Sequence, residues 1–97
     1  MPNYIMLMKW TDQGVKEIKE VTQGLPGIIK AFEAMGGKLT GLYAVMGEYD
    51  LIGIGEAPND EVIMNLALRI GAGGHARTTT LKAFPVEQLT NVVKKLS

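Results

Sequence analysis

The stretch Asn3-Tyr-Ile-Met-Leu-Met-Lys-Trp10 decides how this chain folds. Its even positions hold aromatic or methionine side chains, and two of its odd positions are Ile5 and Leu7. Successive side chains of a strand point to opposite faces of the sheet, so this strand would be apolar on both faces. Two apolar faces are typical of a strand in the middle of a covered sheet. We therefore predict that residues 3–10 form a central strand.

The rest of the chain divides into short periodic segments separated by Gly and Pro residues. Some segments place apolar residues at helical spacing, and others at the spacing of a strand. We predict helices over residues 12–35, 59–70 and 85–96, and further strands over residues 38–46, 49–57 and 75–83.

Glycine and proline predict three local features of these segments. Residues 23–27, Gln-Gly-Leu-Pro-Gly, interrupt the first helix, so we expect a break near Gly24 to Gly27 with Pro26 opening the resumed helix. Gly36-Gly37 would then end this helix in a left-handed cap. Gly47-Glu48 has the length of a tight hairpin connection, with Gly47 able to take a positive φ.

The predicted order of elements is βαββαβ followed by one extra helix. Right-handed crossovers turn this order into an α+β ferredoxin-like sandwich, with an antiparallel sheet of order 4-1-3-2 and helices on one face. A chain of 97 residues has room for one core, so we treat residues 1–97 as a single domain. Helices on one side cannot cover both faces of the first strand. The simplest cover for the second face is another copy of the chain, which predicts a homodimer or a higher homo-oligomer.

Composition argues against several classes of function. Ten Lys and Arg residues balance ten Asp and Glu residues, so neither nucleic acid nor an anionic membrane is expected as the main partner. The chain has no Cys and one His, and we expect no metal site and no cofactor. No basic segment precedes the short apolar run at the N-terminus, which is therefore neither a signal peptide nor a membrane span. We expect a small cytoplasmic protein.

Tyr49-Asp50 is the first candidate for a binding or catalytic site. Asp50 could act as a general base or anchor a ligand, with the Tyr49 hydroxyl beside it as a hydrogen-bond donor. The alternative, which we favour, is structural: Asp50 accepts hydrogen bonds from backbone N–H groups of the turn, and Tyr49 packs on the core with its hydroxyl outside.

The second candidate site lies at the start of the fourth predicted strand. His75 and Arg77 share a face by the period of two, and we expect Trp10 and Glu56 beside them. Arg77 could hold a carboxylate or phosphate, and His75 could move a proton. The structural alternative is an ion pair between Arg77 and Glu56, with His75 at the loop exit, where a lone His is more often structural or solvated. We place this cluster about 20 Å from Asp50, a strand length away.

Gly53 and Gly55 lie on one face of the third predicted strand, where each glycine weakens the strand. Either a helix or an aromatic ring packs closely on the bare backbone, or the glycines leave room for a ligand. We favour close packing.

Several motifs together resemble those of the GYD domain family, and they run in order along nearly the whole chain. They are residues 4–14, Gly36-Gly37-Lys38-Leu39, Tyr43, Gly47-Glu48-Tyr49-Asp50, residues 56–61 and residues 77–84. The naming Gly-Tyr-Asp triplet matches with Glu48 inserted after Gly47. The resemblance implies a bacterial or archaeal protein whose ferredoxin-like halves pair sheet to sheet as a dimeric α/β barrel. It supplies no catalytic residues.

Our preferred function is a homo-oligomeric binding or accessory protein with a pocket for a small molecule, an anionic one being the candidate. The pocket would lie between helices and sheet or at the dimer seam. An alternative is a cofactor-independent enzyme of the dimeric α/β-barrel kind: a monooxygenase, an isomerase or a lyase. A third is a stand-alone regulatory oligomerisation module. A titratable group deep in a closed pocket would favour the enzyme.

Overall fold

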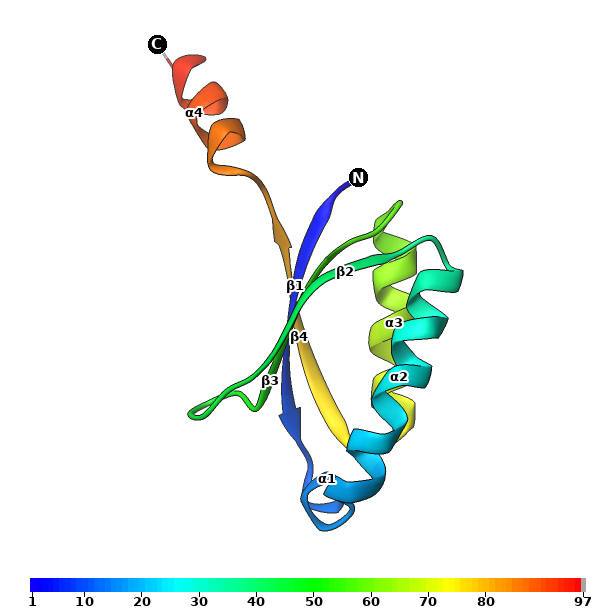
Figure 1. The fold of residues 1–97 in the computed structure, drawn as a ribbon. Helices are drawn as coiled ribbons and strands as arrows, with labels where there is room; N and C mark the ends of the chain where they lie inside the picture. Colours follow the sequence, from blue (N-terminus) through cyan, green and yellow to red (C-terminus); the bar gives the residue numbers. More distant parts are fainter. Residues whose placement is uncertain (97) are drawn as a thin grey trace.

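The fold is a four-stranded antiparallel sheet covered on one face by helices (Figure 1). We describe it from a computed structural model, over residues 1–96. The strand order β2-β3-β1-β4 is the predicted order read from the other edge, so the predicted α+β class and topology are confirmed. The elements are β1 (Asn3–Trp10), α1 (Asp12–Lys16), α2 (Ile18–Ala34), β2 (Lys38–Ala44), β3 (Leu51–Glu56), α3 (Asp60–Ala72), β4 (Ala76–Ala83) and α4 (Val86–Lys94).

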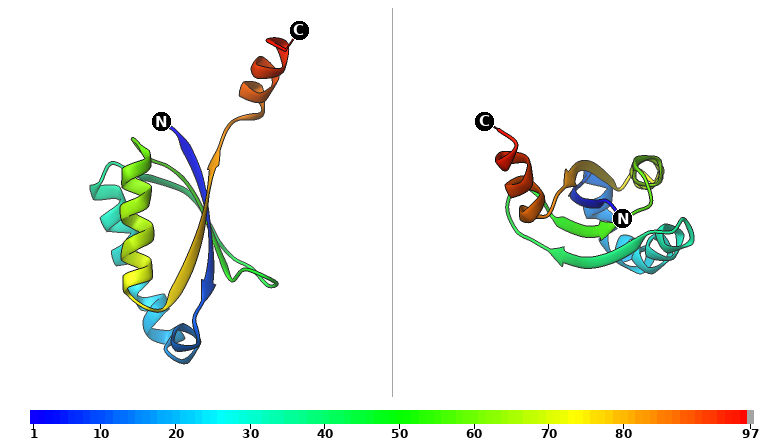
Figure 2. Two further views of the ribbon diagram at one scale, coloured as in Figure 1. Left: turned by 180° about the vertical axis from the view of Figure 1, so that it is seen from behind. Right: turned by 90° about the horizontal axis from the view of Figure 1, so that it is seen from above.

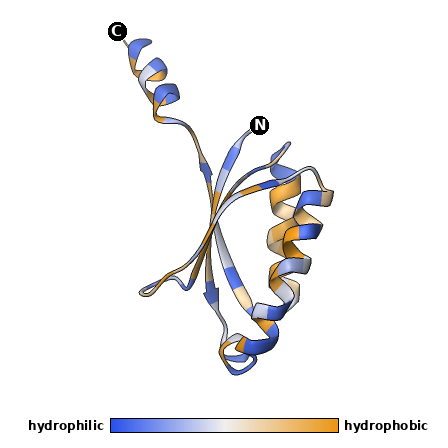
Figure 3. Ribbon diagram, in the orientation of Figure 1, coloured by the Kyte–Doolittle hydropathy of each residue, from blue (hydrophilic) through white to orange (hydrophobic). Residues whose placement is uncertain are grey.

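Strand β1 is central, as its two apolar faces predict. It pairs with β3 on one side, Met6 opposite Gly53, and with β4 on the other, Met6 opposite Thr80. Its even side chains face α2 and α3 and form the core with Phe32 and other residues of the helices. Figure 3 shows hydrophobic residues in both of these helices and along the strands.

The first helix is broken at Glu17, and the predicted break at Gly24 to Gly27 is wrong. Helix α2 runs without interruption through Pro26. Glu17 ends α1 and begins α2, with φ −107° and ψ 29°. The predicted left-handed cap at the end of α2 is confirmed, since Gly36 has φ +91° and the Gly37 N–H donates to the Phe32 carbonyl (3.0 Å).

A long-range contact explains why the chain turns at Glu17. The His75 carbonyl accepts the Thr11 N–H at 2.9 Å, and a Cβ on Gly14 would lie 2.0 Å from the same oxygen. Helix α1 is therefore held against the start of β4 by a close approach that only glycine allows. Helix α2 lies over the sheet instead, so the direction changes between the two.

The connection between β2 and β3 is longer than the tight hairpin that we predicted. The strands end at Ala44 and begin again at Leu51, and the Val45 N–H donates to the Asp50 carbonyl (2.9 Å) across the loop. The predicted positive φ is present at Gly47, with a value of +126°.

Helix α4 stands apart from the rest of the fold. The three views in Figures 1 and 2 show it beyond the end of β4, on the side of the sheet away from α2 and α3. None of its residues is buried. Within residues 1–96, no helix is long and apolar enough to cross a bilayer, and the cytoplasmic location stays a prediction.

Candidate functional site

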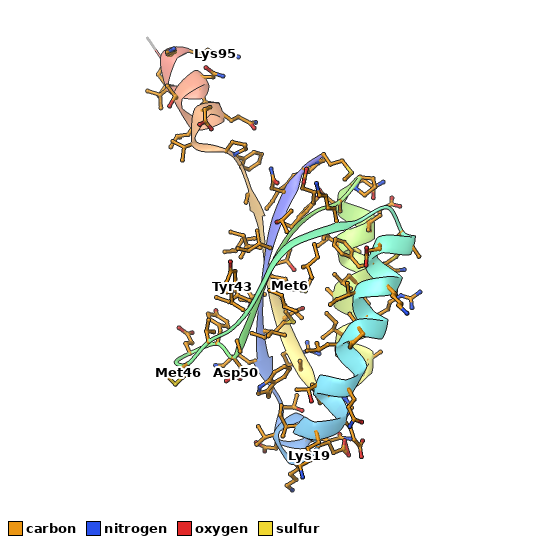
Figure 4. The ribbon with its side chains drawn as sticks, viewed as in Figure 1. Met6, Lys19, Tyr43, Met46, Asp50 and Lys95 are labelled. Atoms are coloured by element: carbon orange, nitrogen blue, oxygen red, sulfur yellow. The ribbon has the colours of Figure 1, made fainter. Side chains whose placement is uncertain are left out.

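A cavity of about 260 Å³ lies between the helix layer and the covered face of the sheet. Met6, labelled in Figure 4, points into this layer from β1. Most of the lining is apolar, with Glu20, Arg69 and His75 as the charged or titratable side chains besides the buried Tyr4. The apolar lining includes Met6, Met8, Trp10, Val21, Leu25, Ile28, Phe32, Leu42, Leu51, Leu66 and Ile70.

The two glycines of β3 have different surroundings in this cavity. A Cβ on Gly55 would lie 2.7 Å from the Lys38 carbonyl oxygen and 3.4 Å from the Phe32 ring. Close packing, the reason that we favoured, is confirmed there. A Cβ on Gly53 would come no nearer than 3.7 Å to any atom, the Met8 Cε. Gly53 therefore leaves space that a side chain would occupy.

His75 lines the cavity and is paired with Glu17. The two side chains meet at 2.7 Å, Nε2 to Oε2, and each is about one-third exposed. The hydrogen bond from His75 lowers the pKa of the Glu17 carboxyl most, and a hydrogen bond from Gln13 lowers it further. Through this contact at Nε2, His75 holds the junction of α1 and α2 against the start of β4.

Arg77 does not join His75 in the cavity. It lies opposite Lys9 on β1, is exposed, and is not among the lining residues. Its Nη1 reaches 3.6 Å from where a Cβ on Gly71 would be, at the end of α3. The predicted joint use of His75 and Arg77 to hold an anion stays a prediction.

Glu56 lies at the other end of the sheet, and its predicted place beside His75 and Arg77 is wrong. Glu56 is opposite Asn3 at the start of β1, whereas Arg77 is opposite Lys9 near its end. The reason is strand direction: β3 runs antiparallel to β1, so the end of β3 meets the start of β1. The alternative ion pair between Arg77 and Glu56 is absent from residues 1–96 for the same reason.

Asp50 lies at the same end of the sheet as Trp10, not a strand length from it. Its Oδ2 accepts the Trp10 N–H at 2.9 Å, and its own N–H donates to the Met8 carbonyl at 2.9 Å. The expected separation of about 20 Å from the His75 end is therefore wrong, because Trp10 pairs with Ala76, next to His75. The Asp50 carboxylate therefore accepts a backbone N–H of β1, not one of the turn as its structural alternative supposed, and Tyr49 beside it is half-buried.

A second polar cluster, which the sequence did not indicate, closes the opposite end of the helix layer. The Tyr4 hydroxyl donates to Oδ1 of Asp60 at 2.5 Å, and the Lys82 ammonium lies 3.0 Å from the same oxygen. The hydrogen bond to Asp60 and burial raise the pKa of Tyr4 to about 12, and the same bond, with Lys82, lowers the pKa of Asp60. Tyr4 thus stays protonated at neutral pH and anchors the start of α3 to β1.

The GYD domain family model matches residues 4–93. The chain belongs to the GYD domain family. It is 29% identical over 90 residues to a protein of Thermus thermophilus named "Glutamine synthetase and cystathionine beta-lyase binding protein". That match covers 92% of this chain and 95% of the relative.

A solved structure supports the fold of this GYD domain. The crystal structure of TTHA0845 from Thermus thermophilus superposes with a TM-score of 0.54, covering 88% of this chain and 95% of that one. The two sequences are 20% identical, so the likeness concerns the fold alone.

The cavity of this GYD domain takes several lining residues from α2 and α3 that were not singled out as candidates. Gly24 and Leu25 of α2 and Arg69 and Ile70 of α3 are among them. One signal was present: Gly24 stands among apolar residues at helical spacing, where a larger side chain would raise helix propensity. A small residue on such a face suggests space between the helix and the layer below it.

Proposed function

We propose that this GYD domain is a self-associating binding protein that holds a small, largely apolar molecule between its helices and its sheet. The observation that carries the proposal is the cavity of about 260 Å³ with an apolar lining. Concave, mostly apolar cavities with a few polar groups are the usual form of small-molecule sites. Gly24 and Gly53 both line it and leave it open, since a Cβ on Gly24 would have nothing within 4 Å.

The volume and the charged groups suggest the ligand's chemistry. A dry engineered cavity of about 150 Å³ holds benzene, so this one has room for about ten non-hydrogen atoms. Arg69 donates from Nε to Asn65 at 2.8 Å and makes no ion pair within residues 1–96. Its remaining guanidinium N–H groups can receive a carboxylate at the edge of the cavity. An apolar body with one anionic end fits both features.

Two titratable groups of the cavity form hydrogen bonds within the protein. Tyr4 is held protonated by its hydrogen bond to Asp60, and His75 is bonded to Glu17. A general base needs an unoccupied nitrogen or oxygen within hydrogen-bond reach of its substrate. The Tyr4 hydroxyl is engaged in this way, whereas His75 is bonded through Nε2 alone, so the binding role rests on the apolar lining of the cavity.

Self-association rests on the face of the sheet that no helix covers, here called the open face. Its centre consists of aliphatic side chains from β1, β3 and β4 in register, and Tyr43 of β2 continues it with 60% exposure. These aliphatic residues are Ile5, Leu7, Ile52, Ile54 and Leu81. A continuous apolar surface of this kind is typical of a protein interface, and a second copy presents the same surface to it.

A matched pair of glycines tests the ligand proposal. Gly24 and Gly27 both lie in α2 with nothing within 4 Å of a Cβ, but only Gly24 lines the cavity. We expect octanoate, with an apolar chain and one carboxylate, to bind the wild type by calorimetry. Gly24→Leu should lose that binding and Gly27→Leu should keep it. Arg69→Gln should weaken octanoate but not octan-1-ol.

Two results would count against the ligand proposal. Equal octanoate binding by the Gly24→Leu and Gly27→Leu variants would place the ligand outside the cavity. No binding of either probe by the wild type would remove an alkyl chain of this size as the ligand.

A second candidate function is binding to another protein. It rests on the printed name of the Thermus thermophilus relative, which describes that protein as binding glutamine synthetase and cystathionine beta-lyase. The matching test is calorimetry of this chain against both purified enzymes from its own host. Absence of heat with either enzyme would leave the small-molecule role as the better one.

A further inference from the structure

Helix α4 has an apolar stripe that nothing within residues 1–96 buries. Val86, Leu89 and Val93 follow one another at helical spacing, and Val92 lies beside them; all four are more than half exposed, at 72%, 61%, 52% and 53% in that order. The other side of the helix is polar. A helix with such a stripe normally buries it against another element.

The single chain is also more extended, and exposes more surface, than a compact monomer of its size. Its accessible surface is 6723 Å² for a mass of 10.5 kDa, where a compact monomer of that mass exposes about 5,400 Å². Its radius of gyration is 15.1 Å, against about 12.5 Å expected for its length. The difference in area, roughly 1,300 Å², exceeds the ~800 Å² that each partner buries in an interface of standard size.

Helix α4, which contributes to this extra exposed area, lies on the same side of the sheet as the open face. All three views in Figures 1 and 2 place α4 on the side of the sheet away from α2 and α3. The tip of the β2–β3 loop carries Met46, fully exposed, and Figure 4 shows Met46 and Tyr43 on that side too. The open face thus has the apolar stripe of α4 beyond one end and the exposed Met46 beyond the other.

We propose that α4 is an arm that packs its apolar stripe on a second copy of this chain, beside the open face. The proposal rests on the self-association proposed above and adds the element that reaches across. Phe84 and Pro85 alone connect β4 to α4, and Pro85 is extended (φ −56°, ψ 146°), so α4 continues away from its own sheet. In a symmetric pair each copy gives one arm and receives one.

Two double variants of α4 test the arm. Leu89→Asp with Val93→Asp places two carboxylates on the apolar stripe. Gln88→Asp with Asn91→Asp adds the same charge on the polar side. We expect the stripe variant to raise the dimer dissociation constant at least about 100-fold in sedimentation equilibrium, because both buried side chains become charged. The polar-side control should stay within a few-fold of the wild type. Equal dissociation constants for the two variants would overturn the proposal.

A crosslinking experiment separates an arm that crosses to the partner from one that folds back on its own sheet. The chain contains no Cys, so a benzophenone maleimide attached at Leu89→Cys labels one site. We expect covalent dimers on irradiation, and few from the same label at Asn91→Cys. Intramolecular products alone would show that α4 covers its own chain and would overturn the proposal even for a dimeric protein. A wild type that sediments as a monomer at every concentration would instead remove self-association itself.

Discussion

The two faces of the sheet are built from the same strands but are completed in different ways. On β1, Tyr4, Met6 and Met8 face the helices and are 4%, 6% and 8% exposed. Ile5 and Leu7, between them in sequence, face the other way and are only partly buried. Both sets are apolar, so the sequence specifies two buried faces while the single chain supplies the cover for one. This difference between the two faces of β1 is the basis of the proposed self-association.

The polar contacts of the two faces differ as well. The covered face is closed at one end by the pair of Glu17 and His75, and at the other by Tyr4, Asp60 and Lys82. On the open face, Arg77 lies opposite Lys9 at one margin, with no ion pair for either within residues 1–96. Specific polar contacts therefore fix the helix layer, whereas the open face offers apolar area with charges at its margin.

The largest expected effect comes from a charge placed in turn on each face of β1. Met6→Asp puts a carboxylate into the apolar core, where Met6 is 6% exposed and packs in one cluster with Met8 and Phe32. A buried unpaired charge costs about 4 kcal/mol or more, a large part of the stability of a small domain. We expect this variant to be unfolded by circular dichroism at 25 °C.

Leu7→Asp is the matched variant on the open face. It should keep the circular dichroism spectrum of the folded protein and lose self-association in light scattering, because it charges the proposed interface and spares the core. Unfolding of both variants would show that the open face is needed by each chain for its own folding. Unchanged association of Leu7→Asp would remove this face as the interface.

A smaller effect distinguishes the packed and the empty halves of the covered face. Gly55→Ala would bring a Cβ to 2.7 Å from the Lys38 carbonyl, a backbone atom that cannot move aside. We expect it to lower the free energy of unfolding by about 2 kcal/mol, as overpacking commonly does. Gly53→Ala meets nothing closer than 3.7 Å and should change that free energy by less than about 0.5 kcal/mol in urea titrations. Equal losses would mean that the cavity beside Gly53 is filled.

The element order and the sheet topology could be predicted because they depend on patterns that are local in sequence. The apolar run within residues 3–10 and the glycines at 36 and 47 each act within a few residues. The break of the first helix could not be predicted in this way. It depends on the contact between Gly14 and the His75 carbonyl, which joins residues far apart in the chain. Pro26 is tolerated within α2, where the helix is exposed and water can bind the carbonyl that Pro leaves without a donor.

The candidate site was predicted less well, for two different reasons. The place of Glu56 beside Asn3 follows from the sheet order and the antiparallel direction of β3, so it could have been predicted from the sequence. The cavity depends on how far α2 and α3 lie from the sheet, and the apolar pattern does not specify this distance. Asp60 illustrates the same limit, because its bond to Tyr4 needs the start of α3 to lie over β1. Tyr4 and Lys82 are cross-strand neighbours, but nothing local brings Asp60 to them.

The smallest expected effect is an acid-dependent loosening that acts on the covered face alone. Hydrogen bonds from His75 to Glu17 and from Tyr4 to Asp60 lower the pKa of both carboxyls in the folded state. A lowered folded pKa stabilises the protein fully above the ordinary carboxyl pKa, and this contribution is lost as the pH falls through the lowered value. The midpoint temperature of thermal unfolding should therefore decrease as the pH is lowered below about 4. This decrease should be less steep in Asp60→Asn than in the wild type. Since neither pair lies on the open face, Leu7→Asp should keep the wild-type slope, and a flattened slope there would show that the two faces are coupled.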